Sequence, residues 1–205
     1  MNRIANIAFF LFAISALSFG QEKGKSKFGY GIGFGTGNST LENNKFGVLN
    51  GNIYSMRFNV DYNFTDKENT KIISGVEFID LNSSFFDGIA QSKLKNEYLQ
   101  IPFRITHGIG FDKEEKLSLV VGAGLYANFL LRSRVTNLDD KINTKSGGVN
   151  FGYILLLGVD YKLSTNTSVG VYGNIMEELD AIENNGYEQK QSEILLFNVG
   201  FSTRF

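Results

Sequence analysis

Residues 117–129, Leu-Ser-Leu-Val-Val-Gly-Ala-Gly-Leu-Tyr-Ala-Asn-Phe, decide the fold class of this chain. Every odd-numbered position in the stretch is apolar, whereas the even-numbered positions include a serine, two glycines and an asparagine. Successive side chains of a β-strand point to opposite faces of the sheet, so this alternation indicates a strand with one apolar face. The stretch therefore predicts a β-protein whose strands separate two different environments.

The same period of two occurs in eight segments of the chain. They are 28–35, 52–64, 70–81, 95–107, 115–131, 149–163, 167–176 and 193–205. Short polar connections alternate with long ones, the long ones being 36–51, 82–94, 132–148 and 177–192. Alternating short turns and long loops are typical of outer-membrane barrels. We therefore expect an all-β fold, an eight-stranded antiparallel up-and-down transmembrane β-barrel, with both termini at the short-turn end.

One face of the predicted sheet carries bulky apolar side chains on nearly every strand. In the segment 149–163 this set comprises Phe151, Tyr153, Leu155, Leu157, Val159, Tyr161 and Leu163. The opposite face is small, polar and charged. Because eight strands enclose room for modest side chains only, we expect the apolar set to face lipid and the small polar set to face the lumen.

Charged residues on the predicted lumen face form the candidate site, a network of Arg57, Asp61, Glu77, Arg104, Asp160, Lys162 and Arg204. A lone buried charge is costly, so we expect these residues to pair with one another. A hairpin turn centred on Lys67 would place Arg57 directly opposite Glu77.

Both ends of the chain carry targeting features. Residues 1–20 combine Arg3, an apolar run, and small residues at Ser18 and Gly20, which is typical of a cleaved secretory signal peptide. We expect residues 21–205 to form the barrel domain. The last strand carries the aromatic residues Phe201 and Phe205, and its pattern resembles the C-terminal signal that the barrel-assembly machinery reads in outer-membrane proteins.

The segment Glu97-Tyr98-Leu99-Gln100-Ile101-Pro102-Phe103 resembles the Tyr-Leu-x-Ile-Pro segment of the PorT-like outer-membrane β-barrel family. The resemblance implies an integral protein of the cell outer membrane in Gram-negative bacteria and supplies no catalytic residue. Some relatives assist secretion and gliding machinery. The expected partners are outer-membrane lipid, the barrel-assembly machinery and an unidentified protein bound by the outer loops, and the barrel is expected to be a monomer.

Composition disfavours several other classes of protein. The chain has no cysteine and a single histidine, His107, which excludes thiolate and two-histidine metal sites. Its 20 basic and 21 acidic residues give a net charge of −1, which does not favour nucleic-acid binding. The alternating glycines of Gly31–Gly35 lie within a predicted strand, where small lumen-facing residues explain them better than a nucleotide loop. We expect no cofactor, no metal and no catalytic role.

Two other functions stay open at this point. A lipocalin-like soluble barrel would turn the apolar set inward and bind a hydrophobic ligand. An outer-membrane lipid-modifying enzyme would need a base such as His107, yet that residue lies beside a predicted periplasmic turn. A porin-like channel is disfavoured because side chains fill an eight-stranded barrel. The favoured interpretation is a non-catalytic barrel whose long outer loops serve interaction or adhesion, with a secretion system as one setting.

Overall fold

The computed structural model describes residues 27–64, 69–86, 91–111, 116–136, 141–145, 148–184 and 187–204. These residues form ten strands: β1 (Phe28–Asn43), β2 (Gly47–Asn63), β3 (Thr70–Phe86), β4 (Gln91–Gly110), β5 (Leu117–Thr136), β6 (Lys141–Lys145), β7 (Val149–Lys162), β8 (Thr167–Glu178), β9 (Ile182–Asn184) and β10 (Tyr187–Arg204). None of the described residues belongs to a helix long and apolar enough to cross a membrane. The predicted signal peptide and Phe205 lie outside the described residues.

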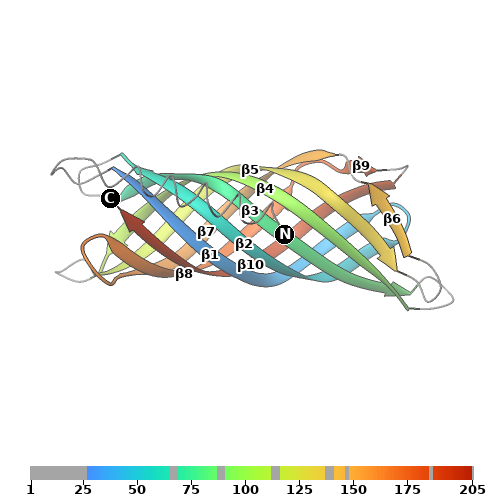
Figure 1. Cartoon of the computed structure of the whole chain (residues 1–205), viewed down its shortest axis with the longest axis horizontal. Helices are drawn as coiled ribbons and strands as arrows, with labels where there is room; N and C mark the ends of the chain where they lie inside the picture. The colour runs from blue at the N-terminus through green and yellow to red at the C-terminus, as the bar shows by residue number, and fades with distance from the viewer. Residues whose placement is uncertain are drawn as a thin grey trace, which may run out of the picture.

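The ten strands form one antiparallel sheet that closes on itself (Figure 1). β1 pairs with β2 on one side and with β10 on the other, so the ring runs through β1, β2, β3, β4, β5, β7, β8 and β10. The up-and-down antiparallel order is as predicted. The strand count of eight is wrong, because the described residues also form β6, which pairs with β5, and β9, which pairs with β10.

The prediction of long loops is also wrong, because the strands continue through most of them. β1 and β2 run through the segment 36–51 and are joined by the turn at residues 44–46 alone. The Asn43 side-chain oxygen closes this turn by accepting hydrogen bonds from the backbone N–H groups of Lys45 (2.9 Å) and Phe46 (3.1 Å). Gly47 then adopts a φ of +76°, which glycine allows without steric cost.

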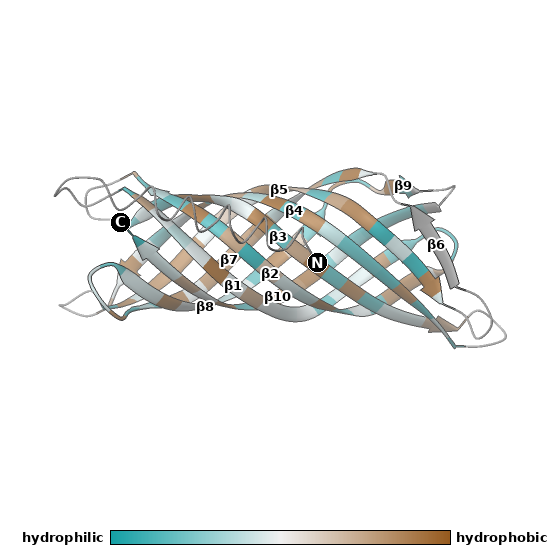
Figure 2. Ribbon diagram, in the orientation of Figure 1, coloured by the Kyte–Doolittle hydropathy of each residue, from teal (hydrophilic) through white to brown (hydrophobic). Residues whose placement is uncertain are grey.

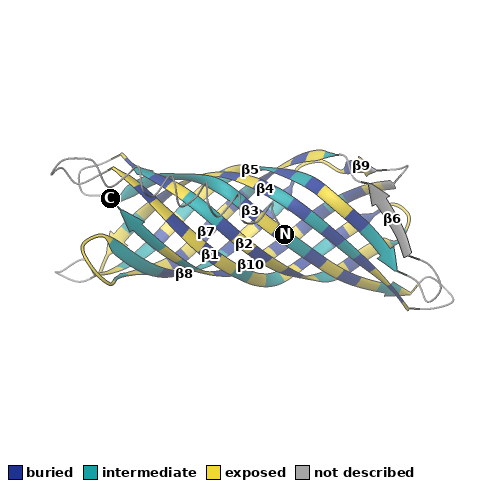
Figure 3. Cartoon of the chain, in the orientation of Figure 1, coloured by how far each residue is buried: buried dark blue, intermediate teal, exposed yellow. Residues whose placement is uncertain are grey.

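The long-loop end of the ring reverses the pattern of the rest of the sheet. Nearer the short turns the outward side chains are apolar, and hydropathy and exposure alternate along the strands (Figures 2 and 3). The first outward carboxylates are Asp80, Glu97 and Glu177. We call the outward surface on the short-turn side of these three residues the apolar band, and the strand ends beyond them the rim. In the rim, Leu41 and Leu49 point inward while Asn50 and Asn52 point outward, so the hydropathy pattern is inverted relative to the apolar band.

Exposure confirms the direction predicted for the apolar set. Val121 and Leu157, which are cross-strand partners on β5 and β7, are 38% and 58% exposed. Phe34, Phe103 and Phe197 are each more than half exposed on the same outer surface. The lipocalin-like arrangement, in which this set would fill the interior, is therefore contradicted by the structure.

The interior is divided into two halves of different chemistry. Charged and small polar residues occupy the half near the short turns, as predicted for the lumen. The other half holds, together with buried polar residues such as Asn96 and Gln191, an apolar cluster of Leu41, Leu49, Ile53, Ile79, Leu81, Leu94, Tyr98, Tyr126, Leu130, Ile154, Met176, Ile182, Ile194 and Leu196. The expectation of a wholly small and polar lumen is thus wrong for this half, where the rim wall faces water and only the interior can bury apolar surface.

Candidate functional site

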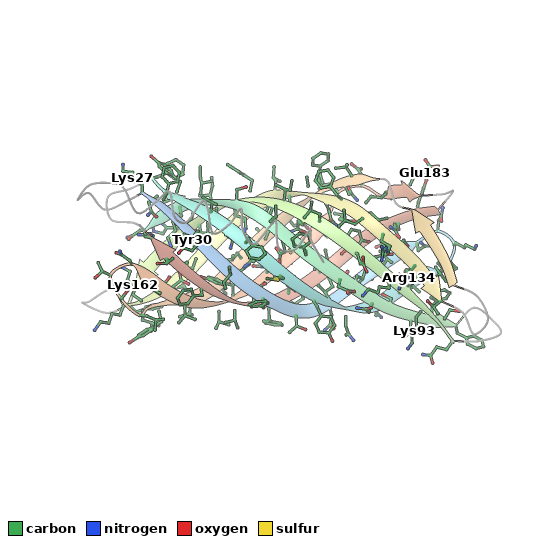
Figure 4. The ribbon with its side chains drawn as sticks, viewed as in Figure 1. Lys27, Tyr30, Lys93, Arg134, Lys162 and Glu183 are labelled. Carbon is green, nitrogen blue, oxygen red and sulfur yellow. The ribbon has the colours of Figure 1, made fainter. Side chains whose placement is uncertain are left out.

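Six of the seven predicted lumen charges line one cavity, which we call the vestibule. Its volume is about 120 Å³, and its charged lining comprises Arg57, Asp61, Lys71, Arg104, Asp160, Lys162 and Arg204. Residues of the short-turn end, including Asn69, Gly110 and Ser164, also line it, so the vestibule opens at that end. Lys162 lies at the same end of the ring as the C-terminal end of β10, opposite to Lys93, Arg134 and Glu183 (Figure 4).

Glu77 is the seventh predicted residue and lies opposite Arg57, so the predicted hairpin register is confirmed. Both side chains are buried, with Arg57 3% and Glu77 1% exposed. Among the described residues, however, neither Arg57 Nε, Arg57 Nη1 nor Glu77 Oε1 has a hydrogen-bond partner. The sequence therefore predicted the juxtaposition of these two charges, but the structure does not join these atoms directly.

Neutral polar side chains on β2 and β8 form hydrogen bonds with three of the charged groups. Arg104 Nη2–H donates to Asn59 Oδ1 at 3.3 Å, and Arg204 Nη2–H donates to Asn63 Oδ1 at 3.1 Å. On the facing wall the Tyr172 hydroxyl donates to the Asp160 carboxylate. The network is therefore extended by neutral groups, as the interior of a barrel requires when it must satisfy charges away from bulk water.

Tyr172 is a member of the vestibule that sequence reasoning missed. Its ring lies 5.4 Å from the Arg57 guanidinium carbon, within the range of a cation–π contact. The alternation of side chains along β8 could have predicted its position. Val171 and Ile175 point outward, so Tyr172 shares the inward face with Gly170 and Asn174.

Inward glycines make the space that the charged side chains occupy. Gly33 is the cross-strand partner of Arg57, and Gly29 is the partner of Asp61. A Cβ atom at Gly33 would lie 2.7 Å from Arg57 Nε, and one at Gly29 would lie 2.6 Å from Asp61 Oδ1. This supports the interpretation of Gly31–Gly35 as small lumen-facing residues.

The vestibule ends at the apolar cluster. No residue of that cluster lines the vestibule, whose inner lining includes Val120 and Leu156. The described part of the barrel therefore has a charged chamber on the short-turn side, and on the rim side an interior that combines the apolar cluster with buried polar residues such as Asn96, Asn128 and Gln191.

A buried carboxylate lies within the rim interior, in the segment predicted as a loop. Glu178 is 1% exposed and accepts hydrogen bonds from Asn128 Nδ2 at 2.7 Å and from the Gln191 backbone N–H at 2.6 Å. Burial raises the pKa of this carboxyl, and the hydrogen bonds oppose that rise in part. Sequence reasoning missed this site because its neighbours Glu177 and Asp180 suggested a solvated segment.

The outer surface of the rim holds a second candidate site. A depression of about 590 Å³ is lined by amide and hydroxyl side chains with one residue of each charge. We call its outward residues, Asn38, Thr40, Asn50, Asn52, Asn82, Ser84, Lys93 and Glu193, the amide patch. Asn52 is the cross-strand partner of both Asn38 and Asn82, which places three amides in one row across β1, β2 and β3.

Ion pairs adjoin the amide patch on the same wall. Lys95 Nζ lies 2.5 Å from Asp80 Oδ2 and 3.8 Å from Glu97 Oε1. Arg132 Nη1 lies 3.9 Å from Glu97 Oε2. These groups are about one-third to one-half exposed, so their contribution to stability is small. Their consequence is a strongly polar outer wall directly beyond the apolar band.

His107 lies where the sequence predicts, at the short-turn end of β4. Its side chain is exposed, and its Nδ1 lies 2.9 Å from the Thr70 hydroxyl oxygen. Within the described ranges, no group of three or more histidine, cysteine or acidic residues is placed to hold a metal ion.

Comparison with solved structures shows the same fold in bacterial proteins. Neisserial surface protein A, from Neisseria, aligns with a TM-score of 0.53 at 16% identity, over 89% of this chain and 100% of that protein. A major outer membrane protein from Thermus thermophilus aligns with a TM-score of 0.50 at 13% identity, over 88% of this chain and 100% of that protein. At these identities the likeness concerns the fold.

Sequence comparison identifies the family. No curated protein matches the chain. A family model described as the outer membrane protein β-barrel domain matches residues 7–205, which include every described strand. Together with the outward apolar band and the ring closed by β1 and β10, this match shows that the chain is an outer-membrane protein that belongs to the outer membrane protein β-barrel domain family.

Proposed function

We propose that this protein is a sealed, non-catalytic barrel that anchors an interaction surface at the outer face of the outer membrane. The observation that carries the proposal is the amide patch, which lies on strands that extend beyond the apolar band. Adhesion or a place in a secretion complex would use such a surface. The Tyr98–Pro102 segment supports the PorT-like branch of the family as the setting.

The length of the strands supports a projecting surface. A tilted transmembrane strand needs about 9–11 residues to cross a bilayer. β1, β2 and β3 contain 16, 17 and 17 residues, and β4 and β5 contain 20 each. These strands are therefore several residues longer than the bilayer requires. Because the outward residues of the rim are polar, we assign the extra residues to the rim, outside the bilayer.

The chemistry of the wall suits a polar partner. Each asparagine side chain offers two N–H donors and an acceptor oxygen. In the amide patch the Thr40 hydroxyl donates to Asn50 Oδ1 at 3.3 Å, while exposed Asn38 and Asn52 show no such side-chain bond to the described residues. A polar macromolecule docked here would find donors and acceptors that otherwise face water.

The packed interior supports anchoring over transport. The apolar cluster occupies part of the rim half of the barrel, and eight ring strands leave little room for a pore. We therefore propose a monomeric barrel without channel activity, surrounded by outer-membrane lipid and without a role in nucleic-acid binding.

The orientation is tested by labelling intact cells. The chain contains no cysteine, so Asn52→Cys and Asn166→Cys each create a unique thiol, one on the rim and one at the short-turn end. A membrane-impermeant maleimide should modify N52C in intact cells and N166C only after lysis. The reverse pattern would place the amide patch in the periplasm and contradict the proposal.

The interaction is tested with a photo-crosslinking amino acid at position 52, with the same amino acid at the lipid-facing position 121 as the matched control. A protein adduct specific to position 52 supports the proposal, whereas identical adducts at both positions contradict it. For the enzymatic alternative, lipid A mass spectra are compared in cells with and without the protein. A change in acyl chains that His107→Ala abolishes would overturn the non-catalytic assignment.

A further inference from the structure

We infer that the vestibule binds a small oxyanion, with phosphate or sulfate as the chemical class, and that the Arg57 and Arg104 guanidinium groups hold it. The anion enters from the short-turn end. This inference concerns the interior of the barrel and is independent of the surface function proposed above.

The first observation is that the two guanidinium groups are buried and have N–H donors without hydrogen-bond partners among the described residues. Arg57 and Arg104 are 3% and 1% exposed, and both line the vestibule. Arg57 Nε, Arg57 Nη1 and Arg104 Nε have no hydrogen-bond partner among the described residues. Buried donors almost always have a hydrogen-bond partner, because a buried donor without one has lost its hydrogen bonds to water and gained no other bond. An anion that accepts from both groups would satisfy these donors together.

The second observation is the balance of charge around the cavity. Five cationic side chains line the vestibule against two carboxylates, those of Asp61 and Asp160. Glu77, opposite Arg57, adds a third carboxylate close by. The remaining positive excess lies in a narrow chamber with low-dielectric walls, which focuses the field and raises the local concentration of anions. A cation would be repelled from the same place.

The third observation is how the two groups are held. Arg57 lies over the Tyr172 ring, and Arg104 donates to Asn59 through Nη2, so each side chain is fixed by a contact that leaves its Nε free to donate. Glycines opposite both residues, Gly33 and Gly124, leave the room they need. Guanidinium groups in fixed orientations suit the oxygens of phosphate and sulfate better than mobile lysines do.

The size of the vestibule limits the ligand. One water molecule needs roughly 10–15 Å³ of such space, and the vestibule measures about 120 Å³. It therefore admits a tetrahedral anion with part of its hydration shell. The open short-turn end also admits a phosphate that ends a larger molecule, so inorganic phosphate and glycerol 3-phosphate are the two probes.

Binding is measured by isothermal titration of the refolded barrel in detergent with each probe. We expect saturable binding of phosphate that weakens at least tenfold in Arg57→Gln and in Arg104→Gln. Lys93→Gln removes a cation from the amide patch and serves as the matched control, which should bind as the unchanged protein does. Preference for inorganic phosphate would indicate a free anion, and preference for glycerol 3-phosphate would indicate an end group; either supports the site.

A second measurement does not depend on the variants. Crystals grown with selenate should show anomalous density within hydrogen-bonding distance of Arg57 Nε and Arg104 Nε. Heat-modifiability on gels shows whether each variant has folded before it is titrated. Absence of both saturable binding and selenate density in the unchanged barrel would overturn the inference, as would equal phosphate affinity in folded Arg57→Gln, Arg104→Gln and Lys93→Gln.

Discussion

Gly33 on β1 is the direct cross-strand partner of Arg57 on β2, and the arginine fills the space where a side chain at Gly33 would stand. Gly33→Val should therefore displace Arg57 and destabilise the barrel by about 1–3 kcal/mol, the usual cost of overpacking. The free energy of unfolding in urea, measured in lipid vesicles, checks this. Gly173→Ala is the control, because a Cβ there meets its nearest atom at 3.8 Å. Equal effects of the two changes would refute the role of Gly33.

Val121 and Leu157 face each other across β5 and β7 on the outward surface. Val121→Arg or Leu157→Arg should destabilise the barrel folded in vesicles by about 2–4 kcal/mol, because arginine is costly on the lipid face near the bilayer midplane. The same substitution at Asn52, on the rim, should be nearly neutral. Unchanged folding yields for both Val121→Arg and Leu157→Arg would count against the assignment of these residues to the lipid-facing surface.

Leu196 and Leu195 are neighbours on β10 with opposite surroundings, at 0% and 41% exposure. Leu196→Ala should cost about 2–5 kcal/mol, because it leaves a cavity in the apolar cluster. Leu195→Ala should cost less, since lipid fills the space that it leaves. Chemical unfolding of both variants tests the difference, and a larger loss for Leu195→Ala would mean that the interior of the rim is not packed.

Glu178 should make stability depend on pH. Its pKa is raised by burial in the folded barrel, so the folded state binds the proton more tightly than the unfolded state does. The stabilisation from this proton is fully present below the unfolded pKa, about 4.3, and is lost as pH rises through the raised folded pKa. Unfolding free energies from pH 4 upwards should therefore fall, and Glu178→Gln should flatten that part of the profile.

The matched control for this pH profile is Glu183→Gln, which changes an exposed carboxyl on β9 and should leave the profile unchanged. A Glu178→Gln profile parallel to that of the unchanged barrel would show that another group sets the dependence.

The apolar band was the part of the fold that sequence could predict. A strand in contact with lipid needs an apolar side chain at every second position. The alternation alone therefore predicts that residues such as Val121 and Leu157 face outward. A short turn fixes the register of a hairpin, which is why the position of Arg57 opposite Glu77 could be anticipated.

The rim could not be predicted, because water replaces lipid at its outer face. Leu41 and Leu49 turn inward there while Asn50 and Asn52 turn outward, so the pattern reverses and resembles polar loops. Asparagine and glycine are also poor strand formers in isolation, and only pairing with neighbouring strands holds them extended. Glu178 was missed for the same reason, since its burial depends on strands that are distant in sequence.

The pairing of β1 with β10 has a consequence for how the molecule is made. The first strand of the barrel finds its second neighbour only when the last strand has been synthesised and exported. Until then, β1 presents an unpaired edge, which readily adds strands from other chains. Contacts between such distant parts of a chain also form slowly. We therefore expect biogenesis of this protein in the cell to use a factor that shields the edge of β1 until β10 pairs with it, so that release of this factor coincides with closure of the barrel.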